Sequence, residues 1–379
     1  MYVSQLSLHD FRNYATLNLS LPSGVVVFSG PNGAGKTNFL EAIYLSSTGE
    51  SPRAREVADM VRFGQEYAFA RTHFTRTDQS LRIEVGLSCA GQRQIKVNGA
   101  VRRRSDLIGL TPVIFFSADD ITVIKGDPGG RRRLIDMELS AVSHSYYLYL
   151  GRYRRTLEQR NRLLKDIRAG RERRTALAPW DRAAARYGAQ VMTERRFFSS
   201  RLSRLAAEAH SRLTEGNQTF MLEYRPSVVG IPEQETSEGE KNEDQFVELV
   251  GQILEETLQT ERETDIGAGV TTHGPHRDDF ELLLDGKPVR TFGSQGQQRA
   301  VALAVRLGLA AVAEQLTGEQ PVLLLDDVLS ELDVTYREGV FAACGAAQQT
   351  FITASDMAYL PAAAAARGTV FEVRDGRIL

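Results

Sequence analysis

The sequence predicts an α/β protein with two lobes, and three observations carry this prediction. A glycine-rich turn from Gly30 to Thr37 lies between a buried apolar run and a helical pattern. Strand and helix patterns alternate again near the C-terminus, whereas the middle of the chain is mostly helical. We therefore expect residues 1–125 and 270–379 to form one nucleotide-binding head, with residues 126–269 inserted as a mostly helical lobe.

Length and composition narrow the class of protein. The 379 residues exceed the usual size of one domain, and 42% hydrophobic with 25% charged residues excludes a fibrous or wholly disordered chain. Polar side chains throughout Met1 to Arg12 do not resemble a secretory signal, and no stretch approaches the roughly 20 apolar residues of a membrane span. Two cysteines, Cys89 and Cys344, cannot build a disulfide framework or a four-ligand zinc site. We expect a cytoplasmic protein with no membrane partner.

The N-terminal third has the alternation of apolar residues that is typical of strands. Val25 to Phe28 is a continuous apolar run and is predicted as a strand buried on both faces, as is Pro112 to Phe116. Residues Leu81 to Cys89 alternate, and the pattern resumes at Ile95 after the Ala90-Gly91 turn, which predicts a hairpin. Two more strands are expected at Leu6 to Leu8 and Leu17 to Leu21.

The rest of the chain changes from helices to an alternating pattern. Helical periodicity extends from about residue 130 to residue 215, including a helix from Trp180 to Leu213, and a last helix of this region covers Phe246 to Leu258. A short strand is expected around Phe220 to Tyr224. The expected C-terminal elements are a strand at Phe280 to Leu284, a helix at Gly296 to Gln315, a strand at Val322 to Asp326, a helix at Val334 to Ala346 and a strand at Thr350 to Thr353.

Charge is segregated along the chain, although the net charge is only −2. Between Gly151 and Arg212 there are 17 Lys or Arg and 6 Asp or Glu, whereas Glu233 to Asp265 holds 12 acidic and 2 basic residues. The basic tract is either a nucleic-acid contact, because cationic side chains release counterions from phosphates, or a solvated helix face paired with the acidic segment. The candidate DNA contacts are Arg131, Arg132, Arg152, Arg154 and Arg155.

The glycine-rich turn has the G-x-x-x-x-G-K-[ST] pattern of a phosphate-binding loop. Its residues are Gly30, Pro31, Asn32, Gly33, Ala34, Gly35, Lys36 and Thr37. Glycines let the backbone curl so that its N–H groups point at phosphate oxygens, and the following helix N-terminus favours anions. Lys36 is expected to reach the β and γ phosphates of ATP, and Thr37 to ligate Mg²⁺.

Two carboxylates follow the apolar run Val322 to Leu325. Asp326 and Asp327 therefore stand at the carboxyl end of a buried strand, where open α/β sheets bind their ligands. We expect Asp326 to hold Mg²⁺, directly or through water, and Asp327 to orient or deprotonate the attacking water. Ile352-Thr353-Ala354-Ser355-Asp356 ends the next strand, where many ABC transporter ATPases carry a switch His. Thr353 is expected at or next to that position, which weakens a transporter reading.

A third motif, Phe292 to Arg299, leads into an apolar helix. Ser294 and Gly296 are similar to the Ser and Gly of the ABC-type signature motif, in which a helix N-terminus completes the nucleotide site of a partner subunit. Ser294 is at the same time a plausible N-cap of its own helix. Ser330-Glu331-Leu332-Asp333, after the paired aspartates, is similar to the D-loop of ABC and SMC-type ATPases.

These motifs, with three further segments, resemble the RecF family over essentially the whole chain. The further segments are Leu8-His9-Asp10-Phe11-Arg12-Asn13-Tyr14, Lys125-Gly126-Asp127-Pro128 with Arg131-Arg132-Arg133, and Thr271-Thr272-His273-Gly274-Pro275-His276-Arg277-Asp278-Asp279. The resemblance implies an ABC/SMC-type ATPase head without a long coiled coil. It also implies a cytoplasmic DNA repair and replication ATPase that binds single-stranded and duplex DNA at gaps.

The family further implies ATP-dependent dimerisation, the partners RecR and RecO, and help in loading the recombinase RecA. Two ATPs would be held between two heads, each by Lys36, Thr37, Asp326 and Asp327 of one subunit and Ser294 of the other. Asp327 departs from the Glu usual in the broader superfamily, so we expect slow hydrolysis that acts as a switch. The alternative is a nucleotide-gated clamp on DNA in which hydrolysis is incidental, and a transporter ATPase is a weaker third reading.

Two groups of residues stay open from sequence alone. Arg12 and Tyr14 either contact adenine or DNA, or pack at a strand edge. The segment His273 to Asp279 is either a metal site or, as we expect, a structural segment or one that couples nucleotide state to DNA, because Gly274-Pro275 breaks a helical spacing of the two histidines. An insertion folded as two antiparallel helices would reach at most roughly 110 Å, and Pro179 makes even that unrealistic, so we expect a compact lobe.

Overall fold

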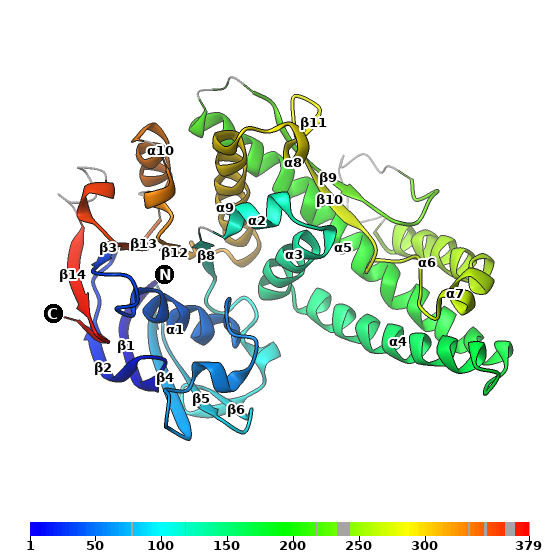
Figure 1. Cartoon of the computed structure of the whole chain (residues 1–379), viewed down its shortest axis with the longest axis horizontal. Helices are drawn as coiled ribbons and strands as arrows, with labels where there is room; N and C mark the ends of the chain where they lie inside the picture. Colours follow the sequence, from blue (N-terminus) through cyan, green and yellow to red (C-terminus); the bar gives the residue numbers. More distant parts are fainter. Residues whose placement is uncertain are drawn as a thin grey trace. The chain divides into compact units, whose positions relative to one another are not determined.

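The computed structural model describes residues 1–76, 79–117, 119–214, 216, 218–232, 243–332, 334–344, 347–360 and 368–378. The chain divides into two compact units. Unit 1 comprises Met1–Thr122, Leu205–Thr219 and Gly293–Leu379, and unit 2 comprises Val123–Arg204 and Phe220–Phe292. Each unit is built from its own sheets and helices, which are labelled in Figure 1.

Unit 1 contains an antiparallel six-stranded sheet in the order β2-β1-β4-β5-β6-β7. Its strands are β1 (Tyr2–Phe11), β2 (Tyr14–Ser20), β4 (Tyr67–Thr75), β5 (Ser80–Ser88), β6 (Arg93–Val97) and β7 (Ala100–Arg102). Alternate residues of β4 and β5 are buried, as the period of two in their sequences requires. The predicted hairpin is β5–β6, with Val85 opposite Ile95.

The second sheet of unit 1 has the order β15-β14-β3-β13-β12-β8. Its strands are β3 (Gly24–Ser29), β8 (Val113–Ser117), β12 (Val322–Asp326), β13 (Gln349–Ala354), β14 (Thr369–Arg374) and β15 (Arg377–Ile378). All neighbouring strands are parallel except β15, which pairs antiparallel with β14. The continuous apolar runs predicted as buried strands are therefore β3, β12 and β8 of this sheet.

Helix α1 (Lys36–Thr48) contacts strands of both sheets and lies between them, as Figure 1 shows. The other helices of unit 1 are α9 (Gln295–Thr317) and α10 (Val334–Cys344), with short 3₁₀ turns at Val57–Met60, Arg104–Leu107, Leu329–Glu331 and Met357–Tyr359. Helix α9 is long and apolar enough to cross a membrane by length and composition, but most of its apolar window is buried inside the protein. A core helix explains that pattern, because α9 packs against β8 and α10.

Unit 2 is mostly helical. Its helices are α3 (Pro128–Val142), α4 (His144–Arg168), α6 (Glu243–Thr260), α7 (Arg262–Ala268) and α8 (Val289–Phe292), with a 3₁₀ turn at Arg174–Leu177. Helix α2 (Asp120–Lys125) and the 36-residue α5 (Ala178–Leu213) each run from one unit into the other. A small sheet, β11-β10-β9, is formed by β9 (Phe220–Arg225), β10 (Asp279–Leu284) and β11 (Lys287–Pro288).

Close helix packing makes unit 2 compact. At Gly188 of α5, an added Cβ would lie 2.6 Å from Leu254 of α6 and 3.2 Å from Tyr153 of α4. Three helices therefore meet at a point where only glycine fits. The expectation of an inserted helical lobe without a long coiled coil is confirmed. The division of the chain by contacts differs from 126–269, because β10, expected in the head, pairs with β9 in unit 2.

Candidate nucleotide site

The phosphate-binding loop connects β3 to α1 and is shaped by its glycines. Gly30, Gly33 and Gly35 have backbone φ angles of 157°, 81° and 118°, which residues other than glycine rarely adopt. A Cβ on Gly30 would also lie 2.1 Å from the carbonyl oxygen of Val373. The first glycine is therefore required both by its backbone angle and by the close approach of β14.

The ammonium group of Lys36 is held by this loop. Its Nζ donates to the carbonyl oxygens of Gly30 at 2.7 Å and Pro31 at 2.9 Å. Burial lowers the pKa of Lys36, and the nearby carboxylates of Asp327 and Asp326 oppose that shift. An ammonium has three N–H donors, so one remains for a further acceptor such as a phosphate oxygen.

Asp326 accepts hydrogen bonds from two hydroxyl groups. Thr37 Oγ1 donates to Asp326 Oδ1 at 2.8 Å, and Thr353 Oγ1 donates to the same oxygen at 2.9 Å. Burial raises the pKa of Asp326, while the two hydroxyls favour its charged form. A hydroxyl and a carboxylate oxygen this close are hard oxygen ligands of the kind Mg²⁺ takes, so the residues present fit that ion.

Asp327 has a strained backbone and spare hydrogen-bonding capacity. Its φ angle of 52° lies in the left-handed region, which is uncommon for residues other than glycine. The strain is held by neighbours, because Asp327 N donates to Thr353 Oγ1 at 2.9 Å and Ser330 Oγ donates to the Asp327 carbonyl at 2.8 Å. Its Oδ1 is buried and has no hydrogen-bond partner within the described residues. Such an acceptor suits a water or a donor that is brought by the substrate.

Thr353 joins both aspartates, a contact that the comparison of its position with the switch His of ABC transporter ATPases did not specify. Glu41 is a residue that sequence reasoning missed. Its side chain is fully buried and accepts from Arg12 Nε and Nη2 at 2.8 and 2.7 Å. Its place in the helix after the loop gave no indication of this pairing. The ion pair ties the turn after β1 to α1.

The open question about Arg12 and Tyr14 receives a structural answer for Tyr14. Its ring is fully buried, and its hydroxyl donates to the carbonyl oxygen of Gly35 at 3.1 Å. Burial raises the pKa of this hydroxyl well above its ordinary value. The packing interpretation fits Tyr14, and Arg12 is engaged with Glu41.

Ser294 caps α9, as the sequence predicts. Gln297 N donates to Ser294 Oγ at 3.3 Å, and Ser294 N donates to Gln297 Oε1 at 2.7 Å, which completes a capping box. Ser294 and Gly296 are both exposed at the helix start, whereas the phosphate loop and the paired aspartates are joined to each other. Asp333 of the D-loop-like motif lies outside the described residues.

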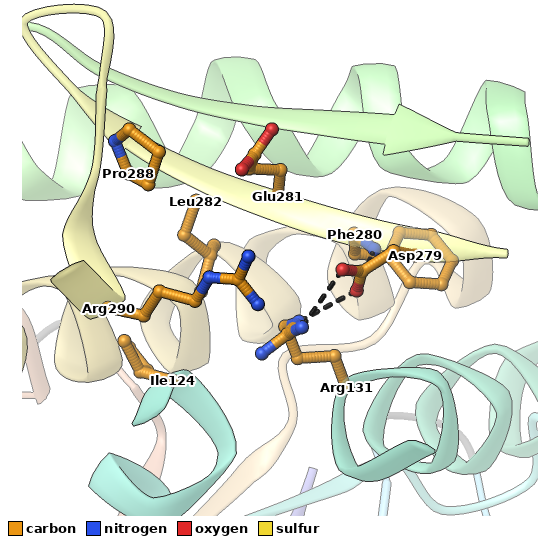
Figure 2. A pocket seen from close by; sticks show the side chains of 8 residues that line it. All are labelled: Ile124, Arg131, Asp279, Phe280, Glu281, Leu282, Pro288 and Arg290. Atoms are coloured by element: carbon orange, nitrogen blue, oxygen red, sulfur yellow. Dashed lines mark hydrogen bonds and ion pairs between the residues drawn. The ribbon is translucent and has the colours of Figure 1, made fainter. Parts of the chain in front are cut away.

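Of the candidate DNA contacts, Arg131 needs correction. Its side chain is buried, and its Nε and Nη2 donate to the carboxylate of Asp279 at 2.8 and 2.9 Å (Figure 2). Its Nη1 donates to the carbonyl oxygen of Gly126 at 2.7 Å. The guanidinium therefore serves the fold of unit 2, where Arg131 lines a small pocket with Arg290 and Phe280, and it is not available to a phosphate backbone.

The other four arginines have looser environments. Arg132 donates to the carbonyl oxygen of Asp278. Arg154 is 62% exposed and pairs with Asp136 at 3.0 Å, so only part of its guanidinium is committed. Arg152 and Arg155 are exposed on α4, Arg152 lying 5.8 Å from the ring centre of Tyr187. Arg152, Arg154 and Arg155 therefore keep cationic surface on α4.

The acidic segment of the sequence lies in part outside the described residues, at 233–242. Acidic residues of its described part pair with arginines of the basic tract, Glu263 with Arg174 at 3.0 Å and Asp265 with Arg160 at 2.6 Å. Arg160 and Asp265 are fully buried. The interpretation as a paired helix face therefore applies to some of the arginines.

The segment Thr271 to Asp279 is held by hydrogen bonds to its neighbours in unit 2. His276 Nε2 donates to the carbonyl oxygen of Thr271 at 2.9 Å, which leaves Nδ1 to accept from Tyr153 at 2.7 Å. Burial lowers the pKa of His276 to about 4. Asp278 accepts from Tyr224 and Ser227, and within the described residues no group of His, Cys, Asp and Glu is arranged to hold a metal ion. The structural interpretation fits these contacts.

Comparison with known proteins matches this architecture. The family model described as RecF/RecN/SMC N terminal domain matches residues 2–377. "DNA replication and repair protein RecF" of Halothermothrix orenii is 35% identical over 380 residues, covering 100% of this chain and 98% of that protein. The protein of the same name from Symbiobacterium thermophilum is 37% identical over 360 residues, covering 94% of this chain and 92% of that protein.

Solved structures agree with the sequence relatives. "Structure of the recombination mediator protein RecF-ATPrS in RecFOR pathway" superposes with a TM-score of 0.88 at 31% identity, covering 100% of this chain and 97% of that one. An Smc head bound to the C-winged helix domain of ScpA has a TM-score of 0.56 at 17% identity, covering 100% and 97%. The second likeness shows the fold alone.

Proposed function

The chain belongs to the RecF/RecN/SMC N-terminal domain family and within it to RecF, and from this premise we propose how it works in DNA replication and repair. It is an ATP-binding ATPase of the SMC and ABC type. In the proposal, ATP closes a homodimer on DNA at single-strand gaps, and slow hydrolysis opens it. RecR and RecO are the proposed partners through which it aids recombinase loading, and the cytoplasm is the proposed location. The RecFOR pathway in the description of its structural relative supports those partners.

The observation that carries the ATPase mechanism is the cluster around Asp326. Thr37 on α1, Asp326 on β12 and Thr353 on β13 are joined by hydrogen bonds of 2.8 and 2.9 Å, so three elements converge where the phosphates of ATP would lie. Thr37 and Asp326 would hold Mg²⁺, which supplies charge neutralisation of the phosphate oxygens when it is bound. Lys36 has one N–H donor left to bind a terminal phosphate oxygen.

We assign the attacking water to Asp327. Its Oδ1 is a buried acceptor without a partner in the described part of the chain, and the bonds from Thr353 and Ser330 hold its backbone in place. An acceptor held this way can orient a water and take up its proton. An aspartate is one methylene shorter than the glutamate of the broader superfamily, and a shortfall of about an ångström is on the scale that costs ~10²-fold in rate. Slow turnover follows from that geometry.

The dimer proposal rests on the exposed start of α9. Ser294 and Gly296 stand at a capped helix N-terminus, which favours an anion, and both are exposed to solvent. In the proposed dimer, this helix start would therefore receive the γ-phosphate of an ATP bound to the phosphate loop of the partner head. A mixed dimer tests this directly. Lys36→Met removes the ammonium group from the phosphate loop of its own subunit, whereas Ser294→Arg blocks the helix start that the subunit offers to its partner's ATP. In a covalently tethered pair of the two variants, one site collects both defects and the other has none.

The tethered pair should recover ATPase activity up to about half of the wild-type value per dimer, if the sites act independently. Each variant tethered to itself is the matched control and should be inactive. Activity in the mixed pair no higher than in these controls would contradict a site shared between two subunits.

DNA contact is proposed for exposed arginines of α4, Arg152, Arg154 and Arg155, with Arg132 nearby in sequence on α3. Their guanidinium groups are at least partly uncommitted, and phosphate binding needs that freedom. Arg131 is left out of this surface because it is buried against Asp279.

A nucleotide-gated clamp with incidental hydrolysis is the alternative. Asp327→Asn separates the two, because the amide keeps the size of the side chain but cannot take a proton. If hydrolysis is the switch, the variant should stay closed on gapped DNA after ATP binding and fail to release it, as measured by the dissociation rate from labelled gapped DNA. A clamp without a hydrolytic switch would release DNA at the wild-type rate in this variant.

A further inference from the structure

The C-terminal hairpin β14–β15 reaches the phosphate-binding loop. Strand β14 pairs in parallel with β3, with Glu372 opposite Ser29, so the hairpin turn Asp375-Gly376 comes beside the loop that follows β3. The backbone N–H of Gly376 donates to the carbonyl oxygen of Ala34 at 2.9 Å. A residue more than 300 positions away therefore binds the middle of the loop.

A second donor holds the same carbonyl oxygen. Asn13, in the turn between β1 and β2, donates from Nδ2 to Ala34 O at 2.9 Å. Its own Oδ1 accepts from Asn38 Nδ2 at 2.9 Å, which fixes the orientation of the amide. The Ala34 carbonyl is thus bound from two hairpin turns that are distant in the sequence.

The three segments are packed without spare space. A Cβ added to Gly376 would lie 2.5 Å from the carbonyl oxygen of Asn13, and a Cβ added to Gly35 would lie 2.7 Å from Asn13 Nδ2. Real side chains do not approach this closely, so a methyl group at Gly376 must push the two backbone segments apart, and one at Gly35 must displace the Asn13 amide. The contact requires glycine at 376 for a reason beyond its φ of 70°.

We propose that Asn13 and Gly376 are positioning residues for ATP binding. In a trans peptide the C=O of one residue and the N–H of the next point in opposite directions. Two hydrogen bonds that hold the Ala34 carbonyl on the outer side of the loop therefore aim the Gly35 N–H toward its inner side. A phosphate bound by the loop needs backbone N–H groups aimed inward, so the two hairpin turns preorganise the loop for its ligand. The inference rests on the proposed ATP site.

The chain offers a matched control for Gly376. The turn Asp285-Gly286 between β10 and β11 has the same backbone conformation, with φ angles of 49° and 74° against 47° and 70° for Asp375-Gly376. A Cβ on Gly286 would meet nothing within 4 Å. Gly376→Ala and Gly286→Ala therefore introduce the same backbone strain, and only the first adds a clash at the phosphate loop.

The experiment measures KM for ATP and kcat for the full-length Gly376→Ala, Gly286→Ala and Asn13→Ala variants, at a temperature where thermal melts show all of them folded. We expect KM to rise about tenfold or more in Gly376→Ala, because displacement of a binding group by about an ångström has effects of that scale. Asn13→Ala adds no bulk and should raise KM less, and Gly286→Ala should stay within about twofold of wild type. The kcat at saturating ATP should change less than about threefold in all three, because Asp326 and Asp327 are held from β12 and β13.

A wild-type KM in both Gly376→Ala and Asn13→Ala would overturn the proposal, as would an equal rise in Gly286→Ala. If Gly376→Ala does not fold, Asn13→Ala decides the question alone. Binding of a fluorescent ATP analogue to Lys36→Met is measured in parallel. Retained binding by Lys36→Met would refute the ATP site itself, whereas lost binding there with unchanged KM in the other variants would refute only the positioning role.

Discussion

Two regions of the molecule bury polar groups, and they do so in opposite ways. Around the phosphate loop in unit 1, Lys36 has a donor left over, Asp327 has an unpartnered buried oxygen, and the Asp327 backbone is strained. In unit 2, Arg160 is fully buried and donates to Asp181, Asp265 and Thr271 at 2.6–2.8 Å. Burial alone therefore does not distinguish Arg160 from Lys36 and Asp327, but the hydrogen-bonding capacity that remains on Lys36 and Asp327 does.

A second cluster in unit 2 also contains a buried arginine that is hydrogen-bonded to protein acceptors, as Arg160 is. Arg195 is buried and donates to Asp136, to the hydroxyl of Tyr146 and to the carbonyl oxygen of Pro275. Burial lowers the pKa of Arg195, but the nearby acidic groups outweigh it and keep the pKa well above its ordinary value. Polar groups that satisfy one another hold helices in register, whereas polar groups with remaining capacity mark a place where a ligand completes the set.

The largest expected effect is the loss of unfolding free energy in Arg160→Met. The variant keeps an unbranched apolar stem but leaves the buried carboxylates of Asp181 and Asp265 without their shared cation, which costs about 3–5 kcal/mol of unfolding free energy. Urea unfolding followed by circular dichroism measures the loss. Arg171→Met is the control, since its pair with Asp166 is exposed and is worth at most about 1 kcal/mol. Equal losses in the two variants would show that the buried cluster has no structural role.

Lys36→Met should show the reverse behaviour. Removal of a cation that would form charge-assisted hydrogen bonds to phosphate should weaken ATP binding about 100-fold, or ~2.7 kcal/mol. The unfolding free energy without nucleotide should change by less than about 1 kcal/mol, because the cost of desolvating the ammonium offsets its bonds to two carbonyl oxygens and its attraction to Asp327 and Asp326. Calorimetric titration with ATP and urea unfolding on the same preparation measure both. A large loss of stability with intact ATP affinity would place Lys36 among the structural groups instead.

The nucleotide site could be predicted from the sequence because its residues lie in short, contiguous motifs. The phosphate loop is contiguous, and Asp326 and Asp327 directly follow an apolar strand, so spacing and order along the chain were enough. The elements β3, α1, β12, α9 and β13 are confirmed within a few residues of their expected bounds. Thr353 was considered only as the residue at the switch-His position of ABC transporter ATPases, and its hydrogen bonds to both aspartates appear only in the structure.

The buried ion pairs and the strand pairings depend on contacts between segments that are distant in the sequence, and no local pattern reveals such contacts. In the sequence, Arg131 is one of three consecutive arginines. Its pairing with Asp279, 148 positions away, shows that it stabilises the fold of unit 2. Strands β4 and β14 were not predicted, and β10 was assigned to the head because its partner β9 lies 54 or more positions earlier. The role of Gly376 likewise required the fold, since an Asp-Gly turn looks the same whether or not a carbonyl oxygen lies 2.5 Å from it.

The smallest expected effect is on the pH dependence of stability. It tests whether His276 belongs with the buried polar groups of unit 2 whose hydrogen bonds are made within the protein. The neutral ring donates to Thr271 and accepts from Tyr153, and burial lowers its pKa to about 4, against an ordinary value near 6.5. The folded protein therefore binds fewer protons than the unfolded chain between these values, so stability falls as the pH decreases through this window. His276 should account for a loss of about 2 kcal/mol between pH 7 and pH 5.

His276→Gln isolates this contribution, because an amide can donate to Thr271 and accept from Tyr153 without titrating. Arg277, Arg132 and Asp265 also act on the ring, and Asp278, whose pKa burial raises, titrates in the opposite sense. These groups are common to both proteins, so the difference between their urea unfolding curves at pH 7 and pH 5 reports His276. We expect the wild type to lose about 2 kcal/mol more than the variant over this range. The same loss in both would mean that folding leaves the pKa of His276 unchanged, so that the ring takes up a proton between pH 7 and pH 5 as readily as in the unfolded chain. Its segment would then belong with the regions that retain free capacity.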